Sequence, residues 1–231
     1  MNRRSAASLV ASLVFADCGG GGAGGSEDAA APANSGGAAP PVASFAGSSS
    51  IAMWGDSLTP PVARAMTLIL PDREIFDGGV IGETSVQIAA RELADEAHRD
   101  WVTTIWCGHN NKTAPAQIAA DIAACVAHLA PGNARFIVIS LLNNAFDVKG
   151  TPGYQTIVEL NNRLAATYPQ NYLDMRGYLV SQFNPANPDE VLDFQNDEPP
   201  RSMRADEAHF NGFGADVAAA RIKQFIEAKG W

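Results

Sequence analysis

The chain has 231 residues, of which 46% are hydrophobic and 18% charged, so it can fold as one domain with a sizeable core. Its formal net charge at neutral pH is -9. A chain this acidic offers no broad basic surface to neutralise a phosphate backbone, and we therefore expect no nucleic-acid partner.

Residues 1–18 have the layout of a secretory signal. Two arginines precede a mostly apolar run over residues 6–16, which is too short to cross a membrane. Cys18 stands where bacterial lipoprotein signals keep the cysteine that becomes lipidated, although Asp17 replaces the small residue expected before it. The sequence predicts export, and we favour attachment to the cell envelope through a lipid on Cys18, on the periplasmic or the outer side, with plain secretion as the alternative.

Residues 19–50 consist almost entirely of Gly, Ala, Ser and Pro with a few acids. Such a composition buries too little apolar area to offset the entropy lost on ordering, so we expect a disordered linker. The folded domain is expected over residues 51–231.

Short apolar runs alternate with amphipathic stretches along this domain. The runs expected to be strands are 51–55, 74–79, 101–108, 135–142 and, as a possible fifth, 171–175. Helical spacing of apolar residues marks 61–70, 85–98, 115–129, 154–168 and 214–229. This alternation predicts a three-layer α/β/α sandwich around a parallel sheet of about five strands, with a flavodoxin-like arrangement.

Polar and glycine residues follow three of the expected strands. They are Asp56-Ser57 after the first strand, Gly78 to Gly82 after the second, and Gly108 to Asn111 after the third. In a parallel sheet, binding sites gather beyond the carboxyl ends of the strands, where the strand order reverses. We therefore expect these segments to meet at one edge of the sheet.

Four short blocks stand in the order and spacing of the SGNH/GDSL hydrolases. They read GDSL at 55–58, GVIGETS at 79–85, GHNN at 108–111 and DEAH at 206–209. Each block alone is weak, but four in register strengthen one another. The chain resembles this family over essentially all of residues 51–231.

The resemblance implies a role for each matching residue. Ser57 matches the nucleophile, His209 the general base and Asp206 the carboxylate that orients the histidine. The oxyanion hole is implied at the Ser57 amide, the Gly82 amide and the Asn110 side chain. This chemistry requires no metal and no organic cofactor, and we expect none.

Each of these residues also has a structural interpretation. Asp56-Ser57 can be a helix cap, Gly82 a turn residue and Asn110 a loop anchor. Asp206 can cap the last helix, with His209 exposed on the surface. Taken singly, these structural roles are as frequent as catalytic ones or more so, and only the four-block context favours catalysis.

His109 and Asn111 are candidate substrate contacts. The GHN sequence resembles the block of rhamnogalacturonan acetylesterases, which indicates carbohydrate esters, but a histidine here can equally pack the loop. Asn111 replaces the aspartate that the family has at this position. In the family that carboxylate shapes the loop, so we expect activity to survive the replacement.

Three further expectations concern residues outside the blocks. His98 and His128 lie near the ends of expected helices and are interpreted as surface or dipole-complementing residues. Cys107 and Cys125 are expected to be buried thiols rather than a disulfide. The long irregular stretch from Phe183 to Arg204 is a candidate for part of the substrate rim.

The sequence thus predicts an exported serine esterase that removes short acyl groups, most plausibly acetyl, from a glycan or similar polyol. The alternatives are a lipase, thioesterase or lysophospholipase of the same family, and a noncatalytic glycan-binding lipoprotein. An α/β-hydrolase is disfavoured because no GxSxG motif surrounds Ser57. The sequence carries no signal for the oligomeric state, and we expect a monomer.

Overall fold

The computed structural model describes residues 46–231. The predictions of a signal over residues 1–18, of a lipid on Cys18 and of a linker up to residue 45 lie outside the described residues. Of the segment before the first strand, Ser50 accepts a hydrogen bond from the Val102 amide through its carbonyl oxygen (3.0 Å), and the Ser48 carbonyl accepts one from Arg135 (2.8 Å).

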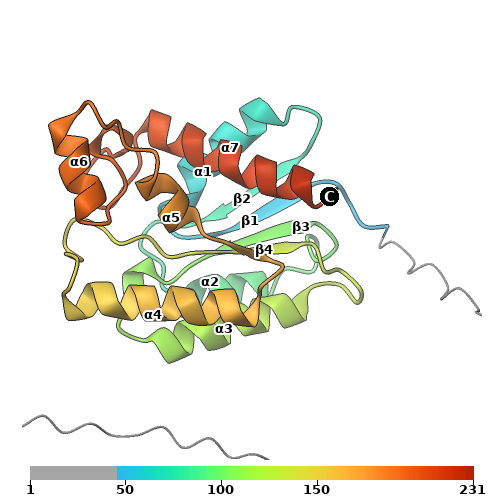
Figure 1. The fold of residues 1–231 in the computed structure, drawn as a ribbon. Coiled ribbons are helices and arrows are strands. Elements are labelled where there is room, and N and C mark those ends of the chain that lie inside the picture. The colour runs from blue at the N-terminus through green and yellow to red at the C-terminus, as the bar shows by residue number, and fades with distance from the viewer. Residues whose placement is uncertain (1–45) are drawn as a thin grey trace, which may run out of the picture. The chain divides into compact units, whose positions relative to one another are not determined.

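Five parallel strands form the central sheet, in the order β2-β1-β3-β4-β5 (Figure 1). The strands are β1 (Ile51–Gly55), β2 (Ile75–Gly79), β3 (Val102–Trp106), β4 (Phe136–Ile139) and β5 (Tyr172–Leu173). This architecture confirms the predicted α/β/α fold, including the fifth strand. The order reverses between β1 and β3, so the loops that follow these two strands open a crevice at the carboxyl edge.

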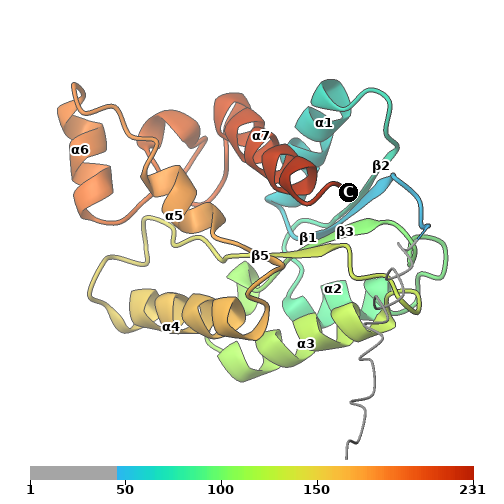
Figure 2. The same cartoon turned by 45° about the vertical axis from the view of Figure 1, so that its right-hand side comes forward.

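Helices cover both faces of the sheet (Figures 1 and 2). One face carries α1 (Thr59–Ile69), α5 (Met175–Val180) and α7 (Gly212–Ala228), whose apolar side chains share a buried cluster with Met53 and Trp106. The other face carries α2 (Ser85–Glu92), α3 (Pro115–His128) and α4 (Pro152–Thr167), which pack on Trp54 and Ile105. Alternate residues of each strand therefore supply two separate cores.

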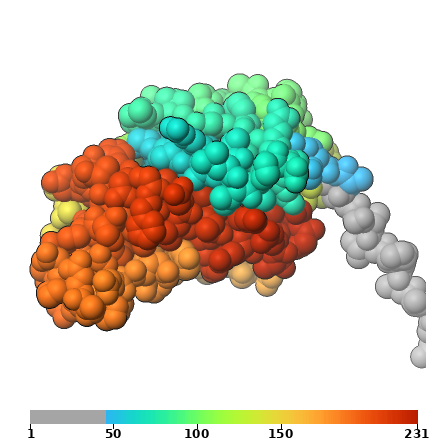
Figure 3. Space-filling view, turned by 90° about the horizontal axis from the view of Figure 1, so that it is seen from above, coloured from blue at the N-terminus to red at the C-terminus, as the bar shows by residue number. Residues whose placement is uncertain are grey.

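Helix α1 begins directly after the loop that carries Ser57. Pro60 and Pro61 lie in its first turn, where their missing amide hydrogens break no helical hydrogen bond. The helix then packs along α7, and Figure 3 shows the two segments, in teal and red, side by side on the surface of the molecule. The segment around Ser57 is thus held between a buried strand and a buried helix.

Two expectations about the helices are wrong. The helix expected over 85–98 ends at Glu92, because the Asp95 side chain accepts the amides of Ala97 and His98 (2.9 and 3.0 Å) and closes a turn instead. The stretch expected to be irregular contains α6 (Pro188–Gln195), which starts where the Asn187 side chain accepts the Asp189 amide (3.1 Å).

His98 and His128, interpreted from the sequence as surface or dipole-complementing residues, are both mostly buried. Their side chains are only 18% and 13% exposed. His98 stacks on Phe76 with ring centroids 4.1 Å apart, and its Nδ1 meets Asp95. His128 lies in the last turn of α3, where a cation complements the helix dipole, as expected. Its Nδ1 also lies 3.3 Å from the buried Glu92.

Cys107 and Cys125 are both buried free thiols, as expected. Burial raises the pKa of each thiol above its ordinary value. Neither thiol therefore has the exposed, electropositive surroundings that make a cysteine reactive.

Within residues 46–231, no helix combines the length and the apolar character needed to cross a membrane.

Candidate active site

Ser57 lies in the loop between β1 and α1, next to the buried Asp56. One oxygen of the Asp56 carboxylate accepts the Leu58 amide (3.1 Å), and the other meets Nδ1 of His109 (2.9 Å). Asp56 thereby fixes the turn that brings the chain from strand to helix. This turn presents the Ser57 hydroxyl at the carboxyl edge of the sheet.

Ser57, His209 and Asp206 form a hydrogen-bonded line. The Ser57 Oγ lies 3.0 Å from His209 Nε2, and His209 Nδ1 lies 2.9 Å from an oxygen of Asp206. Because a carboxylate can only accept, Nδ1 carries the proton and Nε2 is free to accept the serine hydroxyl. The residues predicted to act together are therefore in contact, and His209 Nε2 faces the hydroxyl whose proton a general base would take.

Backbone amides hold the Asp206 carboxylate in its ionised form. The amides of Ala208 and His209 each donate to it at 2.8 Å. These bonds, the one from Ala208 first, and the bond from the His209 ring lower the pKa of Asp206 to about 2. The carboxylate is therefore charged at neutral pH, and half of its surface faces solvent.

The loop that carries these two residues is closed on itself and tied to the start of α7. Arg204 and Phe210 pair as an antiparallel bridge, and Asn211 caps α7 by accepting the Gly214 amide (3.0 Å). Asn211 also donates to the Ser202 carbonyl (2.7 Å). Asn211, rather than Asp206, therefore caps the last helix, which leaves Asp206 to hold its own turn and the imidazole.

Of the two predicted oxyanion donors outside the serine loop, only Asn110 lines the pocket at Ser57. Its Nδ2 donates one hydrogen to the Glu83 carbonyl (2.8 Å), which leaves the second hydrogen of the amide for another acceptor. Gly82 has φ +80, a conformation that favours glycine, and a Cβ there would meet nothing within 4 Å. Gly82 is not among the pocket-lining residues. The backbone conformation of this turn thus favours a glycine at position 82, while the role of Gly82 as an oxyanion donor stays a prediction.

His109 lines the pocket, but the protein uses both of its ring nitrogens. The Leu142 amide donates to Nε2 at 3.0 Å, so Nδ1 must carry the proton that it shares with Asp56. Its polar atoms are therefore engaged before a substrate arrives. This favours the alternative in which His109 packs and orders the loop.

Asn111 joins the loop after β3 to the start of α2. Its Oδ1 accepts the Ser85 amide (3.0 Å), and its Nδ2 donates to the Ser85 hydroxyl (2.9 Å). That hydroxyl donates in turn to Asp121 (2.6 Å). An asparagine can thus hold the loop without the carboxylate that the family has here.

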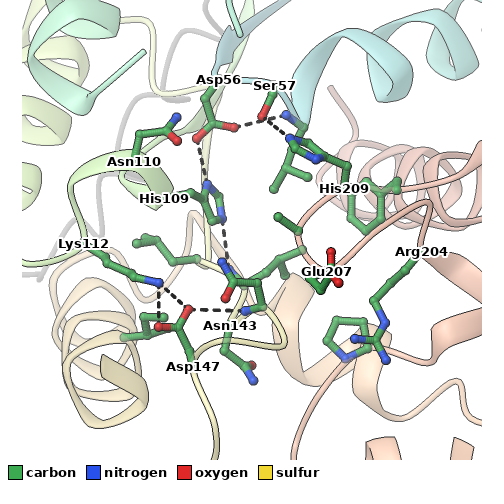
Figure 4. Close-up of a pocket in the computed structure, with 18 residues that line it drawn as sticks. Asp56, Ser57, His109, Asn110, Lys112, Asn143, Asp147, Arg204, Glu207 and His209 are labelled. Atoms are coloured by element: carbon green, nitrogen blue, oxygen red, sulfur yellow. Dashed lines mark hydrogen bonds and ion pairs between the residues drawn. The ribbon is translucent and has the colours of Figure 1, made fainter. Parts of the chain in front are cut away.

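A pocket of about 120 Å³ opens beside Ser57. Figure 4 shows Ser57 and His209 at one end of it, and a second group of polar side chains at the other end. This volume lies well below the roughly 300–1,000 Å³ typical of sites for drug-sized ligands. The space beside the hydroxyl therefore suits a small group.

The sequence did not predict that the polar side chains at the far end of the pocket belong to the site. They are Lys112, Asn143, Asn144, Asp147 and Glu207. The signal was present for two of them, because Asn143 and Asn144 directly follow the predicted strand 135–142 and thus obey the same strand-end rule as Ser57. Lys112 and Asp147, from two different loops, form an ion pair at 2.5 Å. No local sequence pattern predicts this pair.

Within residues 46–231, no group of three or more His, Cys, Asp or Glu side chains is placed to hold a metal ion.

No family model matches the chain. In sequence, it is similar to the tail spike protein of Salmonella phage epsilon15, with 33% identity over 147 residues. These residues make up 58% of this chain but span only 14% of the tail spike protein.

Several solved structures resemble the chain. A GDSL-like lipase from Bacteroides thetaiotaomicron is 19% identical, with a TM-score of 0.61 over 78% of this chain and 89% of that one. The lipase/acylhydrolase from Enterococcus faecalis is 14% identical, with a TM-score of 0.60 over 78% and 96%. An acetyl xylan esterase is 14% identical, with a TM-score of 0.61 over 76% and 98%.

The chain therefore has the fold of the GDSL-type lipases, acylhydrolases and esterases, and the resemblance expected from the four blocks is confirmed at the level of the fold.

Proposed function

We propose that the chain is an exported serine esterase that hydrolyses short-chain carboxylic esters, most plausibly the acetyl esters of a carbohydrate. The observation that carries the proposal is the line from Ser57 Oγ through His209 to Asp206, at the mouth of a small pocket. Export rests on the composition of residues 1–18 alone.

The reaction follows from this geometry in two steps. His209 Nε2 takes the hydroxyl proton as Ser57 Oγ bonds to the acyl carbon, and the carbonyl oxygen becomes an oxyanion. The Ser57 amide and the free hydrogen of the Asn110 amide are the donors that we assign to that charge. The intermediate collapses when His209 returns the proton to the leaving alcohol, which leaves an acyl-serine.

The second step repeats the first with water as the nucleophile. His209 accepts a proton from water as its oxygen attacks the acyl-serine, and returns that proton to Ser57 Oγ when the carboxylic acid departs. The Asp206 carboxylate stabilises the imidazolium in both steps and holds Nδ1 protonated.

The short acyl chain is supported by the size of the pocket. The pocket measures about 120 Å³ over its whole length, which favours a short acyl group over the long chain of a lipase or lysophospholipase substrate. One of the structural neighbours is an acetyl xylan esterase, which supports the acetyl and carbohydrate parts of the proposal without deciding them.

Hydrolysis of a series of 4-nitrophenyl esters tests the acyl part. We expect the acetate to have the highest kcat/KM, activity to fall steeply beyond butyrate, and no activity in the Ser57→Ala variant. Acetate release from acetylated polysaccharides, measured on the same preparations, tests the carbohydrate part. A preference for acyl chains of about ten carbons would contradict the proposal, because such chains need a long apolar channel.

A further inference from the structure

The far end of the pocket contains a buried hydrogen-bond donor without an acceptor. Asn143 is 2% exposed and lines the pocket. Its Oδ1 accepts a hydrogen bond from Arg176 Nε (2.8 Å), whereas its Nδ2 has no hydrogen-bond partner among the described residues. Buried donors are almost always paired in folded proteins, so an unpaired one beside a pocket calls for an explanation.

Arg176 and its partners fix the orientation of the Asn143 amide. Arg176 is ion-paired with Asp197, and Asp197 also accepts the Tyr154 hydroxyl. If the Asn143 amide were turned over, its NH₂ group would face the guanidinium, donor against donor. The network around Arg176 therefore holds the oxygen of Asn143 toward the guanidinium and leaves its Nδ2 hydrogens without an acceptor.

The surroundings of Asn143 suit neutral hydroxyl groups. Lys112 and Asp147 neutralise each other, with the Lys112 ammonium 2.5 and 2.6 Å from the two carboxylate oxygens. Glu207 adds an exposed carboxylate on the opposite loop, and Arg204 is paired with Asp193 and Glu198. Carboxylate acceptors thus stand near an amide donor, and a sugar hydroxyl, which both donates and accepts, matches such a mixture.

An acetyl group cannot satisfy Asn143. Its single oxygen becomes the oxyanion beside Ser57 and Asn110, and the rest of it is a methyl group. An acceptor for the Asn143 amide must therefore belong to the alcohol part of the ester.

We infer that Asn143 binds a hydroxyl oxygen in the alcohol part of the substrate, and that this donor makes the enzyme select esters of polyols over esters of simple alcohols. The inference rests on the proposed function, which it deepens by naming the residue that recognises the leaving group. A site built to bind a substrate hydroxyl discriminates strongly against an analogue that lacks it, because its own polar group is then left unpaired.

Two acetate esters of alcohols with three carbon atoms test the inference. Glycerol 1-monoacetate carries two free hydroxyls, whereas propyl acetate carries none. We expect the ratio of kcat/KM for glycerol monoacetate to that for propyl acetate to fall by about tenfold or more in Asn143→Asp, mainly through KM. This variant preserves the shape and the acceptor that faces Arg176, but replaces the unpaired donor with an acceptor.

Asn143→Leu removes the donor without adding charge and is expected to lower the same ratio. Asn162→Asp is the matched control, since it makes the same change at an exposed position of α4. Because the intrinsic reactivity of the two esters is the same for every variant, the change in the ratio reports the lost contact.

An unchanged ratio in both Asn143 variants would overturn the inference, as would a wild-type enzyme that does not favour glycerol monoacetate. Hydrolysis of 4-nitrophenyl acetate, whose leaving group carries no hydroxyl, monitors folding and the proposed function separately. If the wild type hydrolyses none of the three esters, the proposed function itself fails, and the inference fails with it.

Discussion

The chain has two Asp–His pairs whose imidazoles, His109 and His209, line the same pocket (Figure 4), and the pairs differ in the third group that each imidazole meets. In both pairs, a carboxylate oxygen lies 2.9 Å from the imidazole Nδ1. His209 Nε2 faces a serine hydroxyl, whereas His109 Nε2 accepts a backbone amide. A hydroxyl can release its proton to the ring, but a backbone amide cannot.

Burial separates the two pairs as well. The side chains of His209 and Asp206 are 45% and 50% exposed, while those of His109 and Asp56 are 16% and 1% exposed. Identical residue types at identical distances can therefore form a reactive pair or a structural one. The third partner and the access to solvent decide which, and each of the following predictions tests this difference.

The largest effect is expected for His209→Gln. Without the imidazole, nothing accepts the Ser57 proton, and kcat for 4-nitrophenyl acetate should fall by about 10⁴-fold or more. The free energy of unfolding should change little, because the side chain is half exposed. Steady-state kinetics and urea unfolding of the same preparation measure the two quantities.

Asp206→Asn is expected to have the second largest effect on activity. An amide in place of the carboxylate favours the wrong tautomer of His209 and no longer stabilises the imidazolium. We expect kcat to fall by about 10²–10⁴-fold, with KM nearly unchanged. A loss below about threefold would mean that the Asp206 carboxylate plays no part in the reaction.

His109→Ala should show the reverse pattern. The Asp56 carboxylate and the Leu142 amide lose a partner in a mostly buried place, so the free energy of unfolding should drop by about 1–3 kcal/mol. The Ser57 loop is loosened but keeps its base, so kcat should fall by less than about 100-fold. A loss of activity as large as that of His209→Gln would show that His109 takes part in the reaction, which would contradict its structural role.

The smallest effect concerns the acid stability that Asp206 supplies. Its pKa in the folded chain, about 2, lies below the ordinary value of 3.8. The charged carboxylate therefore stabilises the fold above about pH 4, and this contribution disappears as the pH falls toward 2. The difference in unfolding free energy between wild type and Asp206→Asn should shrink over that interval. A difference that grows there would contradict the assignment.

The sequence was sufficient to predict the fold and the meeting of Ser57, His209 and Asp206, because their signals are local. Alternating apolar runs marked the layers, and polar residues at strand ends marked the edge where Ser57 lies. The spacing of Asp206 and His209 within one turn also placed them on the same short loop.

The supporting residues could not be predicted in this way. Asn143, Arg176 and Asp197 come from three loops or helix ends that meet only in the folded chain, and no periodic pattern relates them. The structural role of His109 depends on the Leu142 amide, 33 positions away. His98 looked exposed because its position near a predicted helix end says nothing of the rings of Phe76 and Trp101 that enclose it.

Labelling with a fluorophosphonate, followed by peptide mass spectrometry, tests most directly whether His209 alone activates Ser57. Our account predicts a single adduct on Ser57 in the wild type and in His109→Ala, and none in His209→Gln over the same time. Equal labelling of Ser57 in His209→Gln and the wild type, or an adduct on another residue, would contradict it.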